Sequence, residues 1–421
     1  MKFGTDGIRG IYPEEINEEI AALLAEAVEE FYEVPKGEIW VIGDTRSSTP
    51  FLVRAIGGKF AGILPTAAAQ VLDGVSVVVS ASHNPSVYNG LKVLRYGEKI
   101  PVEDERELEK IMSSMRTELS EQDLKELVRS REKRHHDFGR GKKDEYVEFL
   151  LNRTSPYKIF EGKVVVDVAC GAAVTVAPSF FRMRGMEDSV KFVAKMGEIN
   201  AGCGATHPGF VKKKMKEVGA RVGIAFDGDA DRMVGWVDDE FVDGTALLVA
   251  AALEYGYKKV AVSILTNWGA VERLREAGVE VIVTPVGDRW LATEVKEGAA
   301  AGSEPSGHVV FEGFKTGDGL VSATVFLDLV ARGVDFSALY KPYAQAVENI
   351  GVRSKDFVNY EDYKKVVEKY REFEGGRSVI RPSGTEPVLR VMVEAVNEDL
   401  AYKMLKEIIE ELRKLIGNEF I

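Results

Sequence analysis

Residues 75–85 read VSVVVSASHNP and join an apolar run directly to a short polar loop. The run Val75–Val79 is rich in β-branched residues and predicts a buried strand. The loop Ser80–Asn84 follows without a spacer, and Pro85 restricts the backbone at its end. In open α/β sheets, ligand-binding loops lie at the carboxyl ends of the strands. This segment therefore predicts an α/β protein with a functional loop after the strand.

The same alternation of helix and strand continues along the chain. Apolar residues repeat at helical spacing from Ile16 to Phe31, and Ser47–Pro50 offers N-cap residues and a proline for a first helical turn. Further strands are expected at Ile39–Ile42, Lys163–Val168, Arg221–Phe226, Val260–Leu265, Val279–Thr284 and Val309–Phe311. This order is typical of βαβ units.

The last part of the chain has a different pattern. Two strand-like runs, Ser378–Arg381 and Val388–Glu394, precede a helix expected at Glu398–Leu415. We therefore predict three similar α/β units with mixed sheets and a C-terminal α+β domain. The expected boundaries are 1–145, 146–240, 241–338 and 339–421.

A charged segment at 103–148 separates the first two units, and it includes the run Arg129–His136. We expect it to be a solvated helical connection with no binding role, because charge runs of this kind usually face water.

Composition limits the class of protein. A chain of 421 residues is too long for one hydrophobic core, and its 45% hydrophobic and 29% charged residues are ordinary for a soluble protein. Its apolar runs are too short to span a membrane. No apolar segment follows Met1, and Cys170 and Cys203 give no disulfide framework, which together indicate the cytoplasm. The net charge of −12 argues against nucleic-acid binding and requires local positive groups for any anionic ligand.

Four loops have the composition of a chemical site. In the first, Ser82 is placed to carry a phosphate covalently if its hydroxyl is exposed and activated. Gly90 lets Lys92 come close behind it. A simple turn is the alternative, and the residues alone leave both readings open. The flanking glycines of an α/β-hydrolase nucleophile elbow are missing.

The second loop, 227–232, contains Asp227, Asp229 and Asp231 and follows an apolar strand. In an extended loop alternate side chains point the same way, so three carboxylates converge on one hard cation. An EF-hand is excluded because Arg232 stands where its loop needs glycine. Because like charges repel, three aspartates favour an open Mg²⁺ site over a plain turn.

The third loop, Gly302–His308, places Glu304 and Ser306 one residue apart, a spacing suited to adjacent sugar hydroxyls. His308 is a possible proton shuttle, although a lone histidine is more often structural.

The fourth loop, Arg381–Pro387, offers consecutive backbone N–H groups, two hydroxyls and a guanidinium, a set suited to a phosphate monoester. A plain β-turn is the alternative.

Together these loops resemble the α-D-phosphohexomutase family, which comprises phosphoglucomutases, phosphomannomutases and phosphoglucosamine mutases. The resemblance covers nearly the whole chain, and it extends through the following motifs: Phe3–Gly10, Gly43–Arg46, Tyr88–Lys92, Val286–Arg289 and Gly317–Gly319. It implies four domains in a heart-shaped arrangement, which agrees with the division above.

The resemblance also implies a role for each matching residue. Ser82 would be the phosphoserine and would bind Mg²⁺ with Asp227, Asp229 and Asp231. The transferring phosphoryl group and proton transfer would be served by Arg9, His83, Lys92 and His308. Substrate would be bound by Arg232, Arg289, Glu304, Ser306, Arg381, Ser383, Gly384 and Thr385.

The implied activity interconverts hexose 6-phosphate and hexose 1-phosphate through a 1,6-bisphosphate, which also serves as activator. A serine-dependent sugar phosphatase and a non-catalytic sugar-phosphate binder on the same fold are the alternatives. The expected partner is a small hexose phosphate, and the chain is expected to be a monomer or homodimer.

Two stretches depart from the family pattern. Ser80 replaces a usual threonine, and Thr206–Gly209 stands where a Pro-Asn-Pro-Glu stretch is common. The sugar is left open among glucosamine, mannose and glucose, with a hint of glucosamine from the opening Phe3–Gly7.

Overall fold

The computed structural model describes residues 2–4, 6–137, 139–154, 157–354, 356–382 and 387–420. Contacts within the chain divide it into two compact units. Unit 1 contains Met1–Ser263 and Ile282–Phe336, and unit 2 contains Ile264–Val281 and Ser337–Ile421. Among the described helices, none has an apolar stretch long enough to cross a bilayer.

The first sheet of unit 1 carries the loop at 80–85. Its strand order is β1-β5-β4-β2-β3-β7, with β6 paired to β5. Strand β2 pairs in parallel with β3 and β4, whereas β5 runs antiparallel to β1 and β4. The strands are β1 (Ile8–Ile11), β2 (Trp40–Gly43), β3 (Lys59–Ile63), β4 (Val75–Val79), β5 (Tyr88–Arg95), β6 (Glu98–Lys99) and β7 (His136–Asp137).

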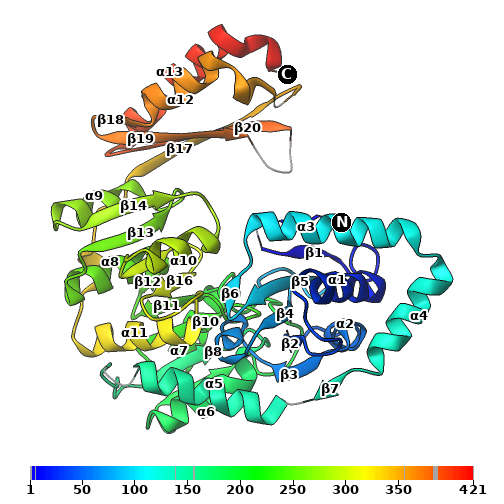
Figure 1. Ribbon diagram of the computed structural model, residues 1–421. Coiled ribbons are helices and arrows are strands. Elements are labelled where there is room, and N and C mark those ends of the chain that lie inside the picture. Colours follow the sequence, from blue (N-terminus) through cyan, green and yellow to red (C-terminus); the bar gives the residue numbers. More distant parts are fainter. Residues whose placement is uncertain are drawn as a thin grey trace. The chain divides into compact units, whose positions relative to one another are not determined.

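Helices cover this sheet, as Figure 1 shows. They are α1 (Glu18–Phe31), α2 (Thr49–Ile56) and α3 (Val102–Glu118), and α4 (Glu121–Glu132) packs on α1 and α2. The apolar face of α1 is fully buried and packs with α2 and the valines of β4 in one core cluster. Pro50 lies in the first turn of α2 as expected, but the Ser48 hydroxyl makes no cap hydrogen bond to that helix and instead accepts one from Asn89.

The second sheet has the order β12-β11-β10-β8-β9 and positions the aspartate loop. Strands β8 and β10 are parallel, and β10 and β11 form an antiparallel pair around that loop. Its strands are β8 (Val164–Asp167), β9 (Val190–Val193), β10 (Val222–Phe226), β11 (Met233–Val237) and β12 (Glu240–Val242). Its helices are α5 (Gly139–Thr154), α6 (Ala173–Met183) and α7 (Gly209–Val218).

The third sheet has the order β14-β13-β15-β16, with the sugar-loop candidate between β15 and β16. Its strands are β13 (Lys259–Ser263), β14 (Glu280–Thr284), β15 (Ala301–Ser303) and β16 (Val309–Phe311). Helices α8 (Gly244–Tyr255), α10 (Asp288–Lys296) and α11 (Gly319–Ala331) accompany it. The mixed α/β class predicted from the sequence is confirmed by these sheets.

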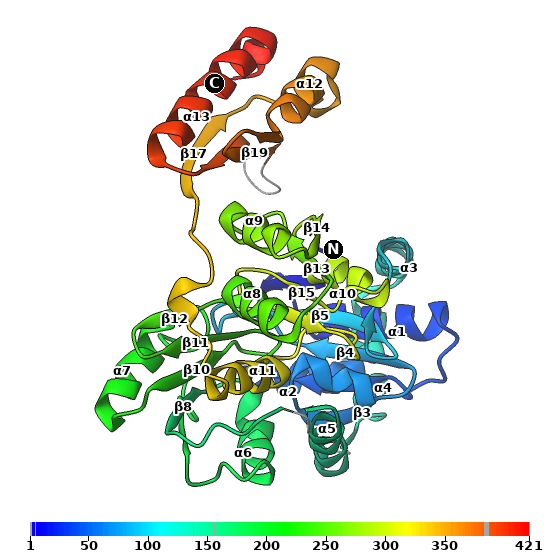
Figure 2. The ribbon, with the colours of Figure 1, turned by 90° about the vertical axis from the view of Figure 1, so that its left-hand side faces the viewer.

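Unit 2 contains an antiparallel sheet of order β17-β20-β19-β18 (Figure 1), and Figure 2 shows helices on one side of this sheet. Its strands are β17 (Ala344–Gly351), β18 (Glu372–Phe373), β19 (Gly376–Pro382) and β20 (Val388–Ala395), and its helices are α9 (Trp268–Glu276), α12 (Glu361–Tyr370) and α13 (Glu398–Ile416). Arg377 of β19 ties α9 to this sheet, because it donates to the carbonyls of Ile264 and Thr266 and stacks on Trp268.

The charged connection differs from the expectation in part. It is mostly helical, as predicted, but β7 joins the first sheet, and Arg131 of α4 is fully buried. Its guanidinium contacts the carboxylates of Glu29 and Glu26 and donates to the Ile56 carbonyl at 2.8 Å. A charge run therefore supplies a core contact here, because arginine can be buried where carboxylates and a carbonyl accept its hydrogen bonds.

Candidate active site

Ser82 lies in the loop between β4 and β5, with a left-handed backbone φ of 51°. Its hydroxyl donates to Asp227 Oδ2 at 2.6 Å, and His83 Nδ1 lies 3.4 Å from the same oxygen. Ser82 is fully buried, so its hydroxyl does not meet the condition of exposure in this structure. The reason is the close approach of the aspartate loop. A Cβ on Gly228 would lie 2.4 Å from the Ser82 carbonyl oxygen, so only glycine lets the two loops meet.

The aspartate loop follows β10, and carboxylate oxygens of Asp227, Asp229 and Asp231 lie within 4.8 Å of one another. The expected extended course is wrong, because the loop turns. The Ala230 N–H donates to the Asp227 carbonyl at 3.1 Å, and Ala230 has a φ of 54°. A compact turn therefore brings the three carboxylates together.

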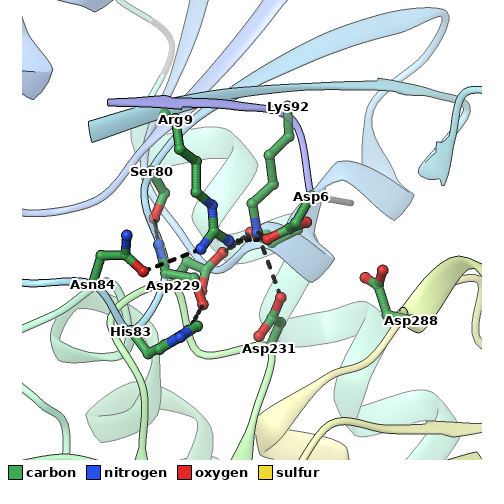
Figure 3. Close-up of polar contacts among 12 residues, drawn as sticks. Asp6, Arg9, Ser80, His83, Asn84, Lys92, Asp229, Asp231 and Asp288 are labelled. Atoms are coloured by element: carbon green, nitrogen blue, oxygen red, sulfur yellow. Dashed lines mark hydrogen bonds and ion pairs between the residues drawn. The ribbon is translucent and has the colours of Figure 1, made fainter. Parts of the chain in front are cut away.

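Two cations from neighbouring strands lie in this site: Lys92 of β5 reaches the carboxylates, and Arg9 of β1 pairs with Asp6 (Figure 3). Arg9 is paired in register with Gly90, and Gly90 lies on the same face of β5 as Lys92. The Lys92 ammonium lies 2.7 Å from Asp229 Oδ2 and 2.9 Å from Asp6 Oδ2. Arg9 also pairs with Asp6 and donates to Asn84 Oδ1 at 3.3 Å.

The surroundings shift the pKa values of Asp227 and Asp229 in opposite directions. Burial, together with Asp231 and Asp229, raises the pKa of Asp227 well above its usual range. Burial also opposes ionisation of Asp229, but the Lys92 ammonium outweighs it and the pKa of Asp229 is lowered. A further cation beside Asp227 would relieve the repulsion there.

The donor set fits such a cation. Oδ1 of Asp229 and Oδ1 of Asp231 are buried, and neither has a hydrogen-bond partner among the described residues. Buried oxygens are normally satisfied, and carboxylate oxygens are the ligands that Mg²⁺ prefers. The cluster of Asp227, Asp229 and Asp231 therefore has the chemistry of a hard divalent-cation site.

The third loop approaches the same cluster. Glu304 Oε1 accepts from the Gly287 N–H at 2.9 Å, and the Ser306 hydroxyl donates to Glu304 Oε2 at 3.2 Å. His308 is buried between two carboxylates, with its ring nitrogens 3.7 Å from Asp231 and 3.7 Å from Asp288. Burial lowers the pKa of His308, but these carboxylates outweigh it and the net shift is upward.

Arg232, His83 and Arg289, which were also predicted as site residues, differ in the contacts that they make. Arg232 donates its backbone N–H to Asp227 Oδ1 at 3.2 Å, while its Nε is 3.9 Å from Asp227 Oδ2 and 3.8 Å from Asp231. Burial, with Arg232 and Arg9 nearby, lowers the pKa of His83 to about 4. Arg289 pairs with Glu105 of α3.

The residues of the fourth loop belong to unit 2. Arg381 lies at the end of β19, directly opposite Arg390 of β20. Ser383, Gly384 and Thr385 lie outside the described residues.

Several charged or polar contacts of this site were not predicted from the sequence. Lys99 pairs with Asp6 and lies 2.6 Å from Asp288, and the Thr66 hydroxyl donates to Asp229 Oδ2 at 2.6 Å. Asp6 and Asp288 lie inside motifs of the family resemblance and could have been found there. Nothing in the sequence around Thr66 or Lys99 indicates a site.

Comparison with known families agrees with this arrangement. The phosphoglucomutase/phosphomannomutase alpha/beta/alpha domain I matches residues 1–118, domain III matches 243–346, and the C-terminal domain matches 349–411. The phosphoglucosamine mutase of Thermotoga neapolitana is 36% identical over 98% of this chain and 98% of its own length. That of Thermotoga maritima is also 36% identical, over 96% and 97%.

Solved structures share the fold. A phosphoglucomutase/phosphomannomutase family protein from Burkholderia thailandensis superposes with a TM-score of 0.77 at 21% identity, covering 97% of each chain. The N-acetylphosphoglucosamine mutase of Aspergillus fumigatus, solved with GlcNAc-6P and magnesium, gives a TM-score of 0.65 at 16% identity, covering 98% of this chain and 96% of that one. With relatives this similar over their full length, the chain belongs to the α-D-phosphohexomutase family and is a phosphosugar mutase, an isomerase.

Proposed function

We propose that the protein moves a phosphate between O6 and O1 of a hexose, with Ser82 as the covalent carrier. One observation carries this proposal: the Ser82 hydroxyl lies 2.6 Å from a carboxylate of the cation cluster, within the same site as Lys92 and Arg9. A serine in a plain turn has no need of such neighbours.

In the proposed cycle, the bond between phosphorus and Ser82 Oγ breaks as a bond forms to the free sugar hydroxyl. The hydroxyl loses its proton to a base and Ser82 Oγ regains one, so a 1,6-bisphosphate results. The bisphosphate then reorients and returns its other phosphate to Ser82. Phosphoryl transfer depends mostly on positioning and charge stabilisation. Lys92 and Arg9 would supply positive charge at the transferring group, and His308 and His83 would assist proton transfer.

Asp227, Asp229 and Asp231 would hold Mg²⁺ together with the phosphate on Ser82. When bound, the ion would neutralise charge on the phosphoryl oxygens. The 2.6 Å contact between Ser82 and Asp227 supports this, because phosphorylation replaces a hydroxyl proton with two negative charges next to a carboxylate. A cation is needed to hold both groups together.

Substrate binding would be shared among the loops. Glu304 and Ser306 are close enough to each other to bind adjacent sugar hydroxyls, and Arg232 and Arg289 would assist. Arg381 would hold the phosphate that is not reacting, with Ser383, Gly384 and Thr385. The register of β19 and β20 supports an anion there, because it places Arg390 directly opposite Arg381 and two neighbouring positive charges attract an anion.

We further propose a hexose 1,6-bisphosphate activator and four domains at 1–145, 146–240, 241–338 and 339–421. The substrate is proposed to be a glucosamine phosphate, since the relatives named above are phosphoglucosamine mutases. We propose a cytoplasmic site of action, which agrees with the free thiols of Cys170 and Cys203.

The test is an assay of the purified protein with glucosamine, mannose and glucose phosphates, a 1,6-bisphosphate and Mg²⁺. Isomer formation and phosphate release are measured together, and peptide mapping locates the phosphate. We expect the glucosamine isomer to form fastest and Ser82 to carry the phosphate. Phosphate release without isomer would indicate a phosphatase, and binding without turnover would indicate a non-catalytic protein. Full turnover by Ser82→Ala would refute the carrier role.

A further inference from the structure

A second network, outside the charged groups described above, holds the loop that carries Ser82. Its centre is Arg46, just after β2, whose side chain is completely buried. Nε of Arg46 donates to Asp44 Oδ2 at 2.9 Å. Nη2 donates to the carbonyls of Ser82 and Asn84, both at 2.9 Å. Nη1 donates to the carbonyls of Pro85 and Tyr88 at 2.5 and 2.9 Å.

These contacts use all five N–H groups of the guanidinium. The guanidinium of Arg46 therefore has no donor left for a phosphate. Its acceptors are four backbone carbonyls, which span the carrier loop from Ser82 to the start of β5, and the carboxylate of Asp44. Its geometry is that of a clamp on the backbone.

The same network reaches the backbone nitrogen of the carrier residue. The Ser80 hydroxyl donates to Asp44 Oδ2 at 2.7 Å and accepts from the Ser82 N–H at 2.9 Å. Arg46 therefore bonds directly to the Ser82 carbonyl. It is linked to the Ser82 N–H through Asp44 and Ser80. These hydrogen bonds are needed because the Ser82 backbone has a left-handed φ of 51°, a conformation that residues other than glycine rarely adopt.

A second residue grips the loop from the other side. Asn200 lies in the segment that connects β9 to α7, and it is 7% exposed. Its Nδ2 donates to the Ser82 carbonyl at 2.8 Å and the Asn84 carbonyl at 3.0 Å. These are two of the carbonyls that Arg46 also binds. The Asn200 N–H donates in turn to the Ala169 carbonyl at 3.0 Å, which fixes the asparagine to the loop after β8.

We infer that Arg46 and Asn200 are positioning residues that hold Ser82 in its left-handed conformation and so aim its oxygen at Asp227. The inference rests on the proposed function, since it concerns the carrier serine. A displacement of about 1 Å at a reacting atom can lower the rate about a hundredfold. Loss of either clamp should therefore lower kcat more than it raises KM, because the sugar-binding residues are elsewhere.

The experiment compares Arg46→Lys and Asn200→Ala with the control Arg131→Lys. Arg131 is as fully buried as Arg46 and also donates to carboxylates and a backbone carbonyl, but it lies among α1, α2 and α4. A lysine ammonium cannot bond to all of the separate acceptors that the guanidinium of Arg46 or Arg131 contacts. Asn200→Ala keeps the test decisive if Arg46→Lys does not fold, since it removes two hydrogen bonds without disturbing a buried charge.

We expect kcat to fall about tenfold or more in Arg46→Lys and Asn200→Ala, with KM within about threefold of wild type. Arg131→Lys should lose thermal stability and retain its kcat. The transfer of phosphate from a 1,6-bisphosphate to Ser82, followed by intact mass, should slow in the two clamp variants.

Two results would refute different statements. A wild-type protein that takes no phosphate on Ser82 refutes the proposed function itself. A wild-type protein phosphorylated on Ser82, with wild-type kcat in both clamp variants or an equal loss of kcat in Arg131→Lys, refutes the positioning role alone.

Discussion

The Ser82 hydroxyl donates a 2.6 Å hydrogen bond to Asp227, across 145 residues of sequence. The contact joins the loop after β4 to the loop after β10, so two separate sheets contribute to one site. It also sets the conditions for phosphorylation, because a phosphate on Ser82 would place new negative charge directly beside Asp227.

The first prediction concerns the cation. Replacing Asp229 with Asn removes one of the three carboxylate charges, so Mg²⁺ affinity should fall about tenfold or more, and mutase activity should fall with it. Titration calorimetry and the activity at varied Mg²⁺ concentration measure the two effects. Asp238→Asn, on an exposed aspartate paired with Arg221, is the control and should change neither. Full activity of the wild type in EDTA would contradict the metal site.

The second prediction tests the division of labour between the loops. Arg381→Ala removes a charge-assisted contact worth about 1.5–3 kcal/mol, so kcat/KM for hexose phosphates should fall about ten- to hundredfold. Phosphorylation of Ser82 by acetyl phosphate should be unaffected, because that donor has no second phosphate. The matched control is Arg371→Ala, an exposed arginine of unit 2 paired with Glu368. If the variant loses activity equally with hexose phosphates and with acetyl phosphate, Arg381 acts at the chemical step or only stabilises the fold.

The third prediction concerns pH and stability. Burial raises the pKa of Asp167 from 3.8 to about 6, although the N–H groups of Gly204 and Ala169 oppose the shift. The folded state therefore holds a proton that the unfolded state has already released between pH 4 and 6. Stability from this group is present below pH 4 and is lost as the pH rises to 6. The difference of 6 − 3.8 = 2.2 pH units corresponds to about 3 kcal/mol.

Asp167→Asn cannot titrate, so its stability relative to wild type should rise by up to about 3 kcal/mol between pH 4 and 7. Urea unfolding at several pH values measures this change, and any constant effect of the substitution cancels. Asp73→Asn, at an exposed position, should run parallel to wild type. A parallel course for Asp167→Asn as well would show that Asp167 does not titrate in this range.

The fourth prediction concerns the buried pair of Arg131 and Glu29. Arg131→Met leaves carboxylates buried without their partner and should cost about 3–5 kcal/mol of unfolding free energy. The double variant Arg131→Met/Glu29→Met should recover part of that loss, because two apolar side chains of similar size need no pairing. Activity per folded molecule should not change in either variant. A double variant less stable than the single one would show that packing, not the lone charge, dominates.

The sequence alone was sufficient for several of the elements and for the residue types of the loops. Strand Val75–Val79 and helix Glu18–Phe31 are local consequences of β-branched runs and helical spacing, so they could be predicted without knowing their partners. The residue types at 82, 227, 229 and 231 likewise define which chemistry is possible, because carboxylates and a hydroxyl have fixed donor and ligand properties.

Only the tertiary structure decided how those residues are held. The burial of Ser82 and the clamp made by Arg46 and Asn200 depend on contacts between segments far apart in the chain. The burial of Arg131 within a charged run has the same origin, since its partners lie on α1 and α2. A sequence pattern records the properties of each side chain, whereas burial and hydrogen bonding depend on which backbone groups the fold places within about 3 Å of it.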